Sequence, residues 1–355
     1  MIPSLLVLLT LAQPLPTRPA DRGPDFRWGV ALGLFASTPD PEYQQILYLP
    51  MLREIAALGA TDVQLSIRWL QVDAQATTMG PARGVTPDDA TVRALLEEAA
   101  RLKLRVFILP IVHLQSRTPG VWRGTLKPTD PERWWAAYRT FILHYAQLAA
   151  GRADLLAVGS ELVSQEADVD RWRALIRDVR AAFPGRLTYS ANWDHYEPVA
   201  FWDALDVVGV SAYWPLARAP GASVEAMQAA WAGVRGQIER FAAAQNRPYL
   251  LTEVGYPSHA FAAVRPWDQD HQGPVDQAAQ ADAWTATLAA WDGAPRLSGL
   301  FVWNWFGVGG PDDSGYTPRG KAAETLLKSW FCGATQRGCP APPGDAAPIS
   351  AGDGR

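Results

Sequence analysis

Two glutamates each end an apolar run that is typical of a buried β-strand. Glu161 ends the run at residues 155–161, and Glu253 ends the run at residues 249–253. The end of a strand holds a side chain rigidly, and two carboxyl groups in fixed positions can cleave a glycosidic bond, one as acid/base and the other as nucleophile. The pair therefore predicts glycosidase chemistry if the fold brings both residues to one site. Taken alone, either glutamate is equally consistent with an ordinary ion pair.

Short β-rich runs alternate with longer amphipathic stretches along the chain. The expected strands are residues 28–34, 62–69, 105–113, 155–161, 187–193, 207–213, 249–253 and 299–305. The expected helices are residues 41–58, 87–103, 131–149, 168–183, 224–244, 277–291 and 318–331, and only the link around 198–205 is short. The strands alternate little between polar and apolar residues, which indicates burial on both faces, as in a parallel sheet covered by helices. Eight such units predict an α/β fold, a single (β/α)8 TIM barrel.

Two of the expected helices start with a recognisable signal. Asp130 precedes Pro131, and Thr86 precedes Pro87. In each pair a side chain that can cap the helix is followed by proline, which is favoured at the first helical position. We therefore expect helices to begin at Pro131 and Pro87.

Composition limits the class of protein. The chain has 355 residues, of which 48% are hydrophobic and 19% charged, with a net charge of −4. No run of Lys or Arg stands out, which argues against nucleic acid as a partner. The length fits one domain, because α/β barrels commonly exceed about 200 residues as a single unit.

The two ends of the chain differ from the middle. We expect an export signal and linker at residues 1–25, a catalytic barrel at 26–333, and a disordered tail rich in Pro, Gly and Ala at 334–355. The apolar run at 1–12 is too short to span a bilayer but suits a secretion signal, with Thr10 and Ala12 as a cleavage site. No Lys or Arg precedes it, so a disordered start is the alternative. We expect a secreted or periplasmic protein without stable membrane insertion.

The chain has two cysteines, Cys332 and Cys339. In an exported protein such a close pair predicts a local disulfide that pins the last helix, and two free thiols are the alternative. Metal binding would need further ligands, and the neighbouring sequence has none. We expect no metal and no cofactor.

Polar and aromatic residues gather where the expected strands end. In a TIM barrel the C-terminal ends of the strands form the active-site rim. The residues at these positions are Arg68, Trp69, His113, Glu161, Asn192, Trp193, Tyr213, Glu253, Trp303 and Trp305. A core would not collect this set, because each buried polar group costs free energy unless it is paired. Singly, however, His113 and the tryptophans are also consistent with packing, and Asn192 with capping a turn.

The order of these residues resembles the retaining glycoside hydrolases of clan A, and several motifs are similar to family 113, whose characterised members are β-mannanases. The similar motifs are Val158-Gly-Ser-Glu-Leu162, Leu187-Thr-Tyr-Ser-Ala-Asn-Trp-Asp194, Asp206-Val-Val-Gly-Val-Ser-Ala-Tyr213, Thr252-Glu-Val-Gly-Tyr256 and Gly315-Tyr-Thr-Pro-Arg-Gly-Lys321. The resemblance covers about residues 26–331. Each motif is short, but their number and order make the resemblance fairly specific.

The resemblance implies roles for single residues. Glu161 matches the acid/base and Glu253 the nucleophile. We expect Arg68 and the Tyr213 hydroxyl to hold Glu253 ionised, and Glu161 to stay protonated because no cation is assigned to it. Trp303 matches the indole beneath the reacting sugar. Ser160 stands where the clan usually has an asparagine that contacts the sugar 2-hydroxyl, so that contact, and the choice of mannose over glucose, is open.

These observations lead to one main hypothesis and several alternatives. We expect a monomeric, retaining hydrolase of β-1,4-linked mannan or a related β-linked oligo- or polysaccharide, with the sugar bound by Arg68, Trp69, His113, Ser160, Asn192, Trp193, Tyr213 and Trp303. The alternatives are a clan A β-glucanase, β-galactanase or exo-β-mannosidase, a transglycosylase, or a non-catalytic carbohydrate-binding barrel. The stretch at 267–271 is best interpreted as a solvated loop that could also line the groove.

Overall fold

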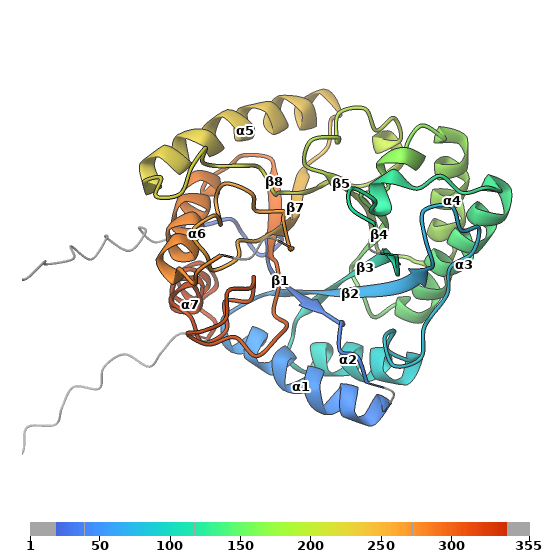
Figure 1. The fold of residues 1–355 in the computed structure, drawn as a ribbon, viewed down its shortest axis with the longest axis horizontal. Coiled ribbons are helices and arrows are strands. Elements are labelled where there is room, and N and C mark those ends of the chain that lie inside the picture. The colour runs from blue at the N-terminus through green and yellow to red at the C-terminus, as the bar shows by residue number, and fades with distance from the viewer. Residues whose placement is uncertain (1–18, 39, 117, 271–272, 339–355) are drawn as a thin grey trace, which may run out of the picture.

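The computed structural model describes residues 19–338 apart from 39, 117, 271 and 272. Eight parallel strands close into a barrel in chain order, with helices around it, which confirms the predicted TIM barrel (Figure 1). The strands are β1 (Arg27–Gly33), β2 (Asp62–Gln71), β3 (Arg105–Leu114), β4 (Leu155–Ser160), β5 (Arg186–Asn192), β6 (Val208–Ser211), β7 (Tyr249–Val254) and β8 (Leu297–Val302).

Helices follow the strands and cover the outside of the barrel (Figure 1). The α-helices are α1 (Pro41–Ala57), α2 (Asp89–Arg101), α3 (Pro131–Ala149), α4 (Val169–Ala182), α5 (Val224–Ala244), α6 (Gln277–Trp291) and α7 (Ala322–Thr335). Three short 3-10 turns lie in loops: η1 (Arg123–Thr125), η2 (Val163–Gln165) and η3 (Trp202–Ala204). The connection from β5 to β6 contains η3, in agreement with the short link expected there.

One of the two predicted helix starts is correct. Asp130 caps α3 and accepts a hydrogen bond from its first turn, with proline at the first helical position. The start at Pro87 is wrong by two residues, because Asp88 is the residue that caps α2. Thr86 has a different role: its hydroxyl donates to the Arg68 carbonyl at 2.9 Å and holds the loop against β2.

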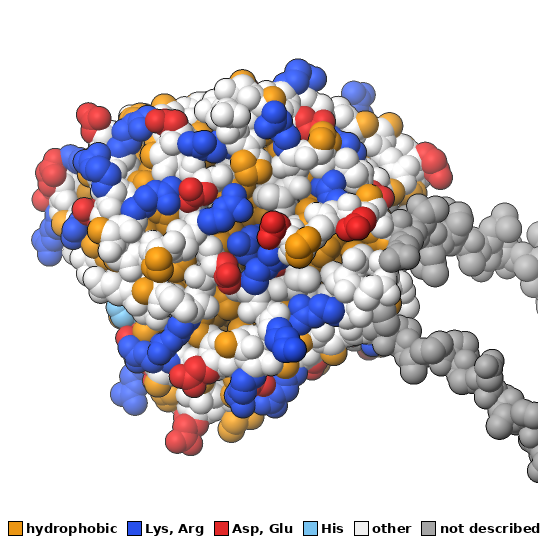
Figure 2. All heavy atoms as spheres, turned by 180° about the vertical axis from the view of Figure 1, so that it is seen from behind, with side chains coloured by type: hydrophobic (Ala, Val, Ile, Leu, Met, Phe, Trp, Pro, Cys, Tyr) orange, Lys and Arg blue, Asp and Glu red, His pale blue; other side chains and the backbone are white. Residues whose placement is uncertain are grey.

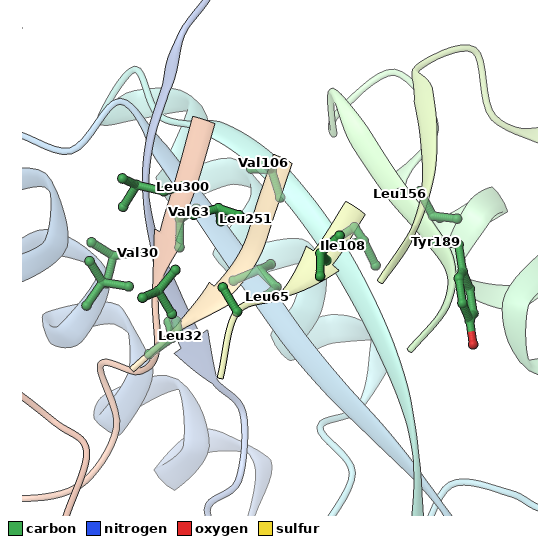
Figure 3. Close-up of a cluster of buried hydrophobic side chains, with 14 of the residues drawn as sticks. Val30, Leu32, Val63, Leu65, Val106, Ile108, Leu156, Tyr189, Leu251 and Leu300 are labelled. Atoms are coloured by element: carbon green, nitrogen blue, oxygen red, sulfur yellow. The ribbon is translucent and has the colours of Figure 1, made fainter. Parts of the chain in front are cut away.

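The strands are buried on both faces because the barrel has two cores. Val30 and Leu32 of β1 pack outward against the helices, whereas Ala31 between them faces the barrel interior. Figure 3 shows part of the outer cluster, with side chains from several strands. Phe107 and Phe301 are among the side chains that fill the interior. Full burial of each large apolar side chain stabilises the fold by about 1.5–3 kcal/mol, so both layers hold the barrel closed.

An ion triad ties the first three strands together at their N-terminal ends. Asp62 is fully buried and pairs with Arg27 at 2.5 Å and with Arg105 at 2.7 Å. Arg105 also donates to the carbonyl of Phe26. A buried carboxylate is tolerated only where charges and hydrogen bonds compensate its lost hydration, and the two guanidinium groups do so here.

The described ends of the chain pack on the barrel. Arg22 donates to the Leu297 carbonyl, and Arg337 donates to the carbonyl of Leu102. The helix α7 ends at Thr335, so it includes the first two residues of the tail that was expected at 334–355. Cys332 is disulfide-bonded. Its expected partner Cys339, the rest of the tail and the expected export signal lie outside the described residues.

The described surface carries mixed charge. On the face shown in Figure 2, Lys and Arg side chains are interspersed with Asp and Glu. Within the part of the chain that the structure describes, every helix is too short or too polar to cross a membrane.

Candidate active site

Both glutamates follow an irregularity in their strand. Between β4 and β5 the register advances three residues, from Ala157 to Ser160, against two on the partner strand. Between β6 and β7, Ser211 pairs with Glu253 although its neighbour Val210 pairs with Leu251, so β7 also has one extra residue. Such bulges re-aim the side chain that follows them. The two carboxyl groups thus turn toward the mouth of the barrel.

The bulge in β4 depends on its glycine and on a tyrosine from α3. A Cβ at Gly159 would lie 2.7 Å from the Tyr138 hydroxyl and 2.8 Å from the Trp172 ring, so no larger residue fits there. The Tyr138 hydroxyl donates to the Val158 carbonyl at 2.8 Å. The motif Val158-Gly-Ser-Glu161 therefore requires glycine at position 159 because side chains pack closely behind the site.

The backbone at Glu161 has a conformation that side chains rarely adopt. Its φ is +52°, in the left-handed region. The Glu161 N–H donates to the Ser190 carbonyl at 2.8 Å, and the Leu162 N–H donates to the Tyr189 hydroxyl at 2.8 Å. These two bonds to β5 hold the strained residue in place.

A buried carboxylate supports this loop from behind. Tyr189 donates to one oxygen of Glu166 at 2.6 Å, and the His195 ring contacts the other oxygen at 2.6 Å. Burial raises the pKa of Glu166, while its bonds to Tyr189 and His195 act in the opposite direction. The sequence analysis missed this network, because Glu166 lies in a loop and not at the end of a strand.

One cavity of about 920 Å³ opens at the rim and collects most of the predicted residues. The predicted site residues that line it are Arg68, His113, Glu161, Asn192, Trp193, Tyr213, Glu253 and Trp303. A cavity of this size suits an oligosaccharide-sized ligand. The two glutamates therefore share one pocket.

Two predicted binding residues lie outside the cavity lining. Trp69 is buried on the helical side of β2, where it stacks on Phe141 and donates to the Tyr145 hydroxyl. The prediction of a sugar contact at Trp69 is therefore wrong. Ser160 is buried and is not among the residues that line the cavity.

The groups around Glu253 have opposite effects on its pKa. The Tyr213 hydroxyl donates to its Oε2 at 2.9 Å, whereas its buried Oε1 has no hydrogen-bond partner among the described residues. Burial and, after it, the charge of Glu161 raise the pKa of Glu253 to about 8, while Arg123 and the bond from Tyr213 lower it. The expected donor Tyr213 is thus in place. Arg68 lines the same cavity and donates to the Phe35 carbonyl at 3.1 Å.

Glu161 has a cation, contrary to the sequence analysis. Arg123 at the start of η1 donates from Nη2 to Glu161 Oε2 at 2.7 Å. The Ser211 hydroxyl of β6 donates to Oε1. Both oxygens of Glu161 therefore accept hydrogen bonds, one of them from a cation. Arg123 was missed because it lies in the loop between β3 and α3, which carries no strand pattern.

The loop after β7 adds an aromatic side to the cavity. Trp267 stacks on Trp193 with ring centroids 5.4 Å apart and an interplanar angle of 29°. Asp268 and Asp270 line the cavity next to it. Of the two possibilities that the sequence left for this stretch, the groove is the one that the lining residues support. His271 lies outside the described residues.

A buried lysine fixes the loop after β8. The Lys321 ammonium donates to Ser258 Oγ at 2.7 Å, to Asp313 Oδ1 at 2.9 Å and to the Gly315 carbonyl at 2.9 Å. Three oxygens compensate the lost hydration of the charge. The next residue of this loop, Tyr316, lines the cavity. Among the described residues no cluster of His, Cys, Asp or Glu could hold a metal ion.

A comparison with models of protein families decides the family. The model of Glycoside Hydrolase Family 113 matches residues 38–313, more than half of the chain. The chain belongs to glycoside hydrolase family 113. The protein is thus a clan A glycoside hydrolase with a carbohydrate substrate, as the resemblance of its motifs implied.

Solved structures of this family are similar over nearly their whole length. The GH113 β-mannanase AaManA from Alicyclobacillus acidocaldarius, in complex with ManMIm, is 26% identical with a TM-score of 0.77, over 86% of this chain and 97% of that one. A second GH113 β-1,4-mannanase is 25% identical with a TM-score of 0.77, over 86% and 99%. A Faecalibacterium prausnitzii β-glucuronidase, 16% identical with a TM-score of 0.58 over 86% of this chain and 49% of that one, shares the fold alone. A search of curated proteins gives no match.

Proposed function

We propose that this family 113 hydrolase cleaves β-1,4-linked mannan, or a related β-linked polysaccharide, with retention of configuration. The observation that carries the proposal is the pair of glutamates, delivered by bulges of β4 and β7 to one cavity. The β-mannanases among the similar structures support the choice of mannan.

Glu161 and Glu253 divide the chemistry between them. The carboxyl group of Glu161 protonates the glycosidic oxygen while a carboxylate oxygen of Glu253 attacks the anomeric carbon, so the bond to the leaving sugar breaks as the glycosyl-enzyme forms. Glu161, now a carboxylate, takes a proton from water, and the water oxygen attacks the same carbon. This step restores Glu253 and releases the sugar with its configuration kept.

The surroundings of Glu253 suit a nucleophile. Its Oε1 has no partner and offers its electron pairs to the sugar, while Oε2 accepts from Tyr213. Burial raises the pKa of Tyr213 well above its usual value, so the phenol keeps its proton and stays a donor. A carboxylate that is little solvated on one oxygen and held on the other is both reactive and well oriented.

The remaining lining residues are suited to hold sugar rings. The indoles of Trp193 and Trp303 offer apolar faces, against which the C–H faces of a pyranose pack. Arg68, His113 and Asn192 provide groups that can hydrogen-bond sugar hydroxyls. Asn192 is held by a bond from its Nδ2 to Asp194 at 2.6 Å, which orients its amide.

A polysaccharide panel with reducing-sugar release tests the proposal. Mannan is expected to be hydrolysed, and Glu253→Gln and Glu161→Gln are each expected to lose about three or more orders of magnitude in kcat, as with other residues that form covalent intermediates. Glu239→Gln is the control, because Glu239 lies on α5 and pairs with Arg235. Release of sugar from another β-linked polysaccharide but not from mannan would refute the substrate. Full activity of Glu253→Gln would refute the mechanism.

We also propose that the protein is exported and works as a monomer. The support is the apolar run at residues 1–12 in the sequence. N-terminal sequencing of protein from the medium or periplasm of the source cells is expected to show a chain that lacks this run. Light scattering of that protein is expected to give the mass of one chain.

A further inference from the structure

The ion pair between Arg123 and Glu161 conflicts with the chemistry of a general acid. Glu161 must carry a proton when the glycosidic bond breaks. In the structure, however, Arg123 donates to one of its oxygens at 2.7 Å and Ser211 to the other, an arrangement that holds a carboxylate. The side chain of Glu161 is only 8% exposed, so water does little to weaken the contact.

The environment of Glu253, the second carboxyl group, favours a proton instead. Glu253 has one oxygen without a partner, and its pKa is raised to about 8 by burial and by the charge of Glu161. Two coupled carboxyl groups then share one proton near neutral pH. Near neutral pH Glu253 is therefore the group that holds a proton, whereas the proposed first step needs it as the attacking carboxylate.

We propose that Arg123 is a positioning residue that pairs with Glu161 while the site is empty and donates instead to a hydroxyl oxygen of the bound sugar. The inference rests on the proposed function. When the guanidinium leaves, the proton passes from Glu253 to Glu161, so Glu253 becomes the carboxylate that attacks and Glu161 the acid. No proton is gained or lost by the pair.

The position of Arg123 allows this exchange. Its side chain is 20% exposed and lines the cavity, and its buried Nε has no partner within the part of the chain that the structure describes. A guanidinium offers five N–H donors, so the donor that leaves Glu161 can be replaced by one that meets a ligand oxygen. The backbone beneath it is fixed, because the Trp122 N–H donates to Thr125 Oγ1 and the Thr125 N–H to the Trp122 carbonyl. Only the side chain needs to move.

Other charged groups around the pair enter any titration of it. These charged or titratable groups are Arg68 of β2, His113 of β3, Tyr189 of β5, Asp194 after β5, Tyr213 after β6, Glu253 of β7, Asp268 and Asp270 after β7, and Glu166 after η2. Variants of Arg123 keep all of these residues, and the loss of the Arg123 charge also raises the pKa of Glu253, which has its own resonance. A difference between variant and parent therefore reports on Arg123.

Carbon-13 NMR of the full chain, labelled at the glutamate side-chain carboxyls, measures the pairing without any substrate. Glu161→Gln and Glu253→Gln assign the two resonances. Arg123→Gln is expected to move the midpoint of the Glu161 titration upward by about one pH unit or more, since an opposite charge at this distance shifts a carboxyl by about 1–3 units. Arg123→Lys, which keeps the charge, is expected to move it by much less. Arg139→Gln, which breaks a pair with Asp178 on the outer helices, is the control and is expected to have no effect.

A second arm tests the release of Glu161. In the Glu253→Gln background, a β-1,4-linked manno-oligosaccharide is expected to move the Glu161 titration upward, and this movement is expected to vanish when Arg123→Gln is added. Likewise the alkaline limb of kcat/KM is expected to move to higher pH in Arg123→Gln, whereas loss of a merely structural residue would lower kcat/KM and leave the limb in place.

The outcomes separate this inference from the proposed function. An unchanged Glu161 titration in Arg123→Gln, or a full shift in Arg123→Lys, overturns the proposed pairing of Arg123 with Glu161. A sugar that binds without moving the Glu161 titration overturns the proposed release of Glu161 by Arg123. A sugar that does not bind contradicts the proposed substrate, and the titration without ligand still decides the pairing. If Arg123→Gln does not fold, Arg123→Met takes its place with the same expected shift.

Discussion

At the scale of single residues, Glu253 carries a free-energy cost that depends on pH. Its pKa is about 8 in the folded protein, against 4.5 for an ordinary glutamate. Between these values the folded chain binds more protons than the unfolded chain, so folding stability falls as the pH rises. The stability linked to this proton is complete below pH 4.5 and is lost as the pH rises through about 8.

Glu253→Gln is therefore expected to stabilise the protein at high pH and not at low pH. The neutral amide removes the cost of a buried charge, for which we expect a gain of about 1–3 kcal/mol near pH 8 and little near pH 5. Thermal denaturation of parent and variant across this range measures the difference. A gain in Tm that is the same at both ends would contradict the assigned titration.

Tyr213→Phe removes the donor to Glu253 Oε2 and keeps the ring. The bond from Tyr213 lowers the pKa of Glu253, so its loss raises that pKa and moves the alkaline limb of kcat/KM, which reports the free enzyme, to higher pH. A hydrogen bond to a charged group contributes about 1.5–3 kcal/mol, so kcat/KM at neutral pH is expected to fall about 10- to 100-fold. The pH profile of kcat/KM on mannan measures both effects, and a variant with an unmoved alkaline limb would show that the Tyr213 hydroxyl does not act on the pKa of Glu253.

The sequence predicted the position of most site residues because strand ends share one rim. It erred at Trp69 for a physical reason: neighbouring side chains on a strand point to opposite faces, so Arg68 and Trp69 cannot both face the pocket. The sequence could not predict that Arg123 contacts Glu161, because the path of a loop without periodicity depends on its contacts in three dimensions. The ionic partner of Glu161 therefore became visible only in the structure.

At the scale of elements, the loop from β4 to η2 depends on a single phenol. The Tyr189 hydroxyl donates to Glu166 and accepts from the Leu162 N–H, next to the left-handed residue Glu161. The helices and strands were largely predictable from their hydrophobic pattern, since a barrel buries every strand. The bulges were not, because the register of a strand depends on its partner.

Tyr189→Phe is expected to lower the free energy of unfolding by about 2–3 kcal/mol, because it leaves two buried polar groups without a partner. It is also expected to reduce kcat, since the backbone at Glu161 loses a support. Urea denaturation and mannan hydrolysis measure these effects. Tyr196→Phe is the matched control, because that hydroxyl makes only a long contact of 3.4 Å with Glu197. Equal losses in the two variants would refute a special role of Tyr189.

At the scale of the whole molecule, the triad of Arg27, Asp62 and Arg105 ties the first three strands together at the N-terminal end of the barrel, opposite the cavity. The eightfold alternation in the sequence predicted the barrel, since few other folds accommodate eight such units. The triad was not predicted, because its members lie 35 and 43 residues apart and their pairing depends on the strand register.

Asp62→Asn keeps the shape of the side chain but leaves two guanidinium groups without their counter-charge. Breaking a buried ion pair from one side costs about 3–5 kcal/mol. We expect a loss of this size in chemical denaturation, with kcat/KM of the folded enzyme unchanged at 25 °C because the triad lies at the opposite end of the strands. Asp178→Asn, which breaks an exposed pair with Arg139, is expected to cost about 0–1 kcal/mol. A similar cost for both variants would show that burial does not matter here.

The stacked pair Trp193 and Trp267 makes ligand binding observable by tryptophan fluorescence. Trp267 is 42% exposed at the mouth of the pocket, whereas many of the other tryptophans are deeply buried. A pyranose that covers this indole shields it from water, so its fluorescence emission is expected to shift to the blue, on top of a constant background from the interior. Titrating Glu253→Gln with manno-oligosaccharide measures occupancy through this signal, and Trp267→Phe is expected to reduce it, leaving the contribution of the lining indoles Trp193 and Trp303.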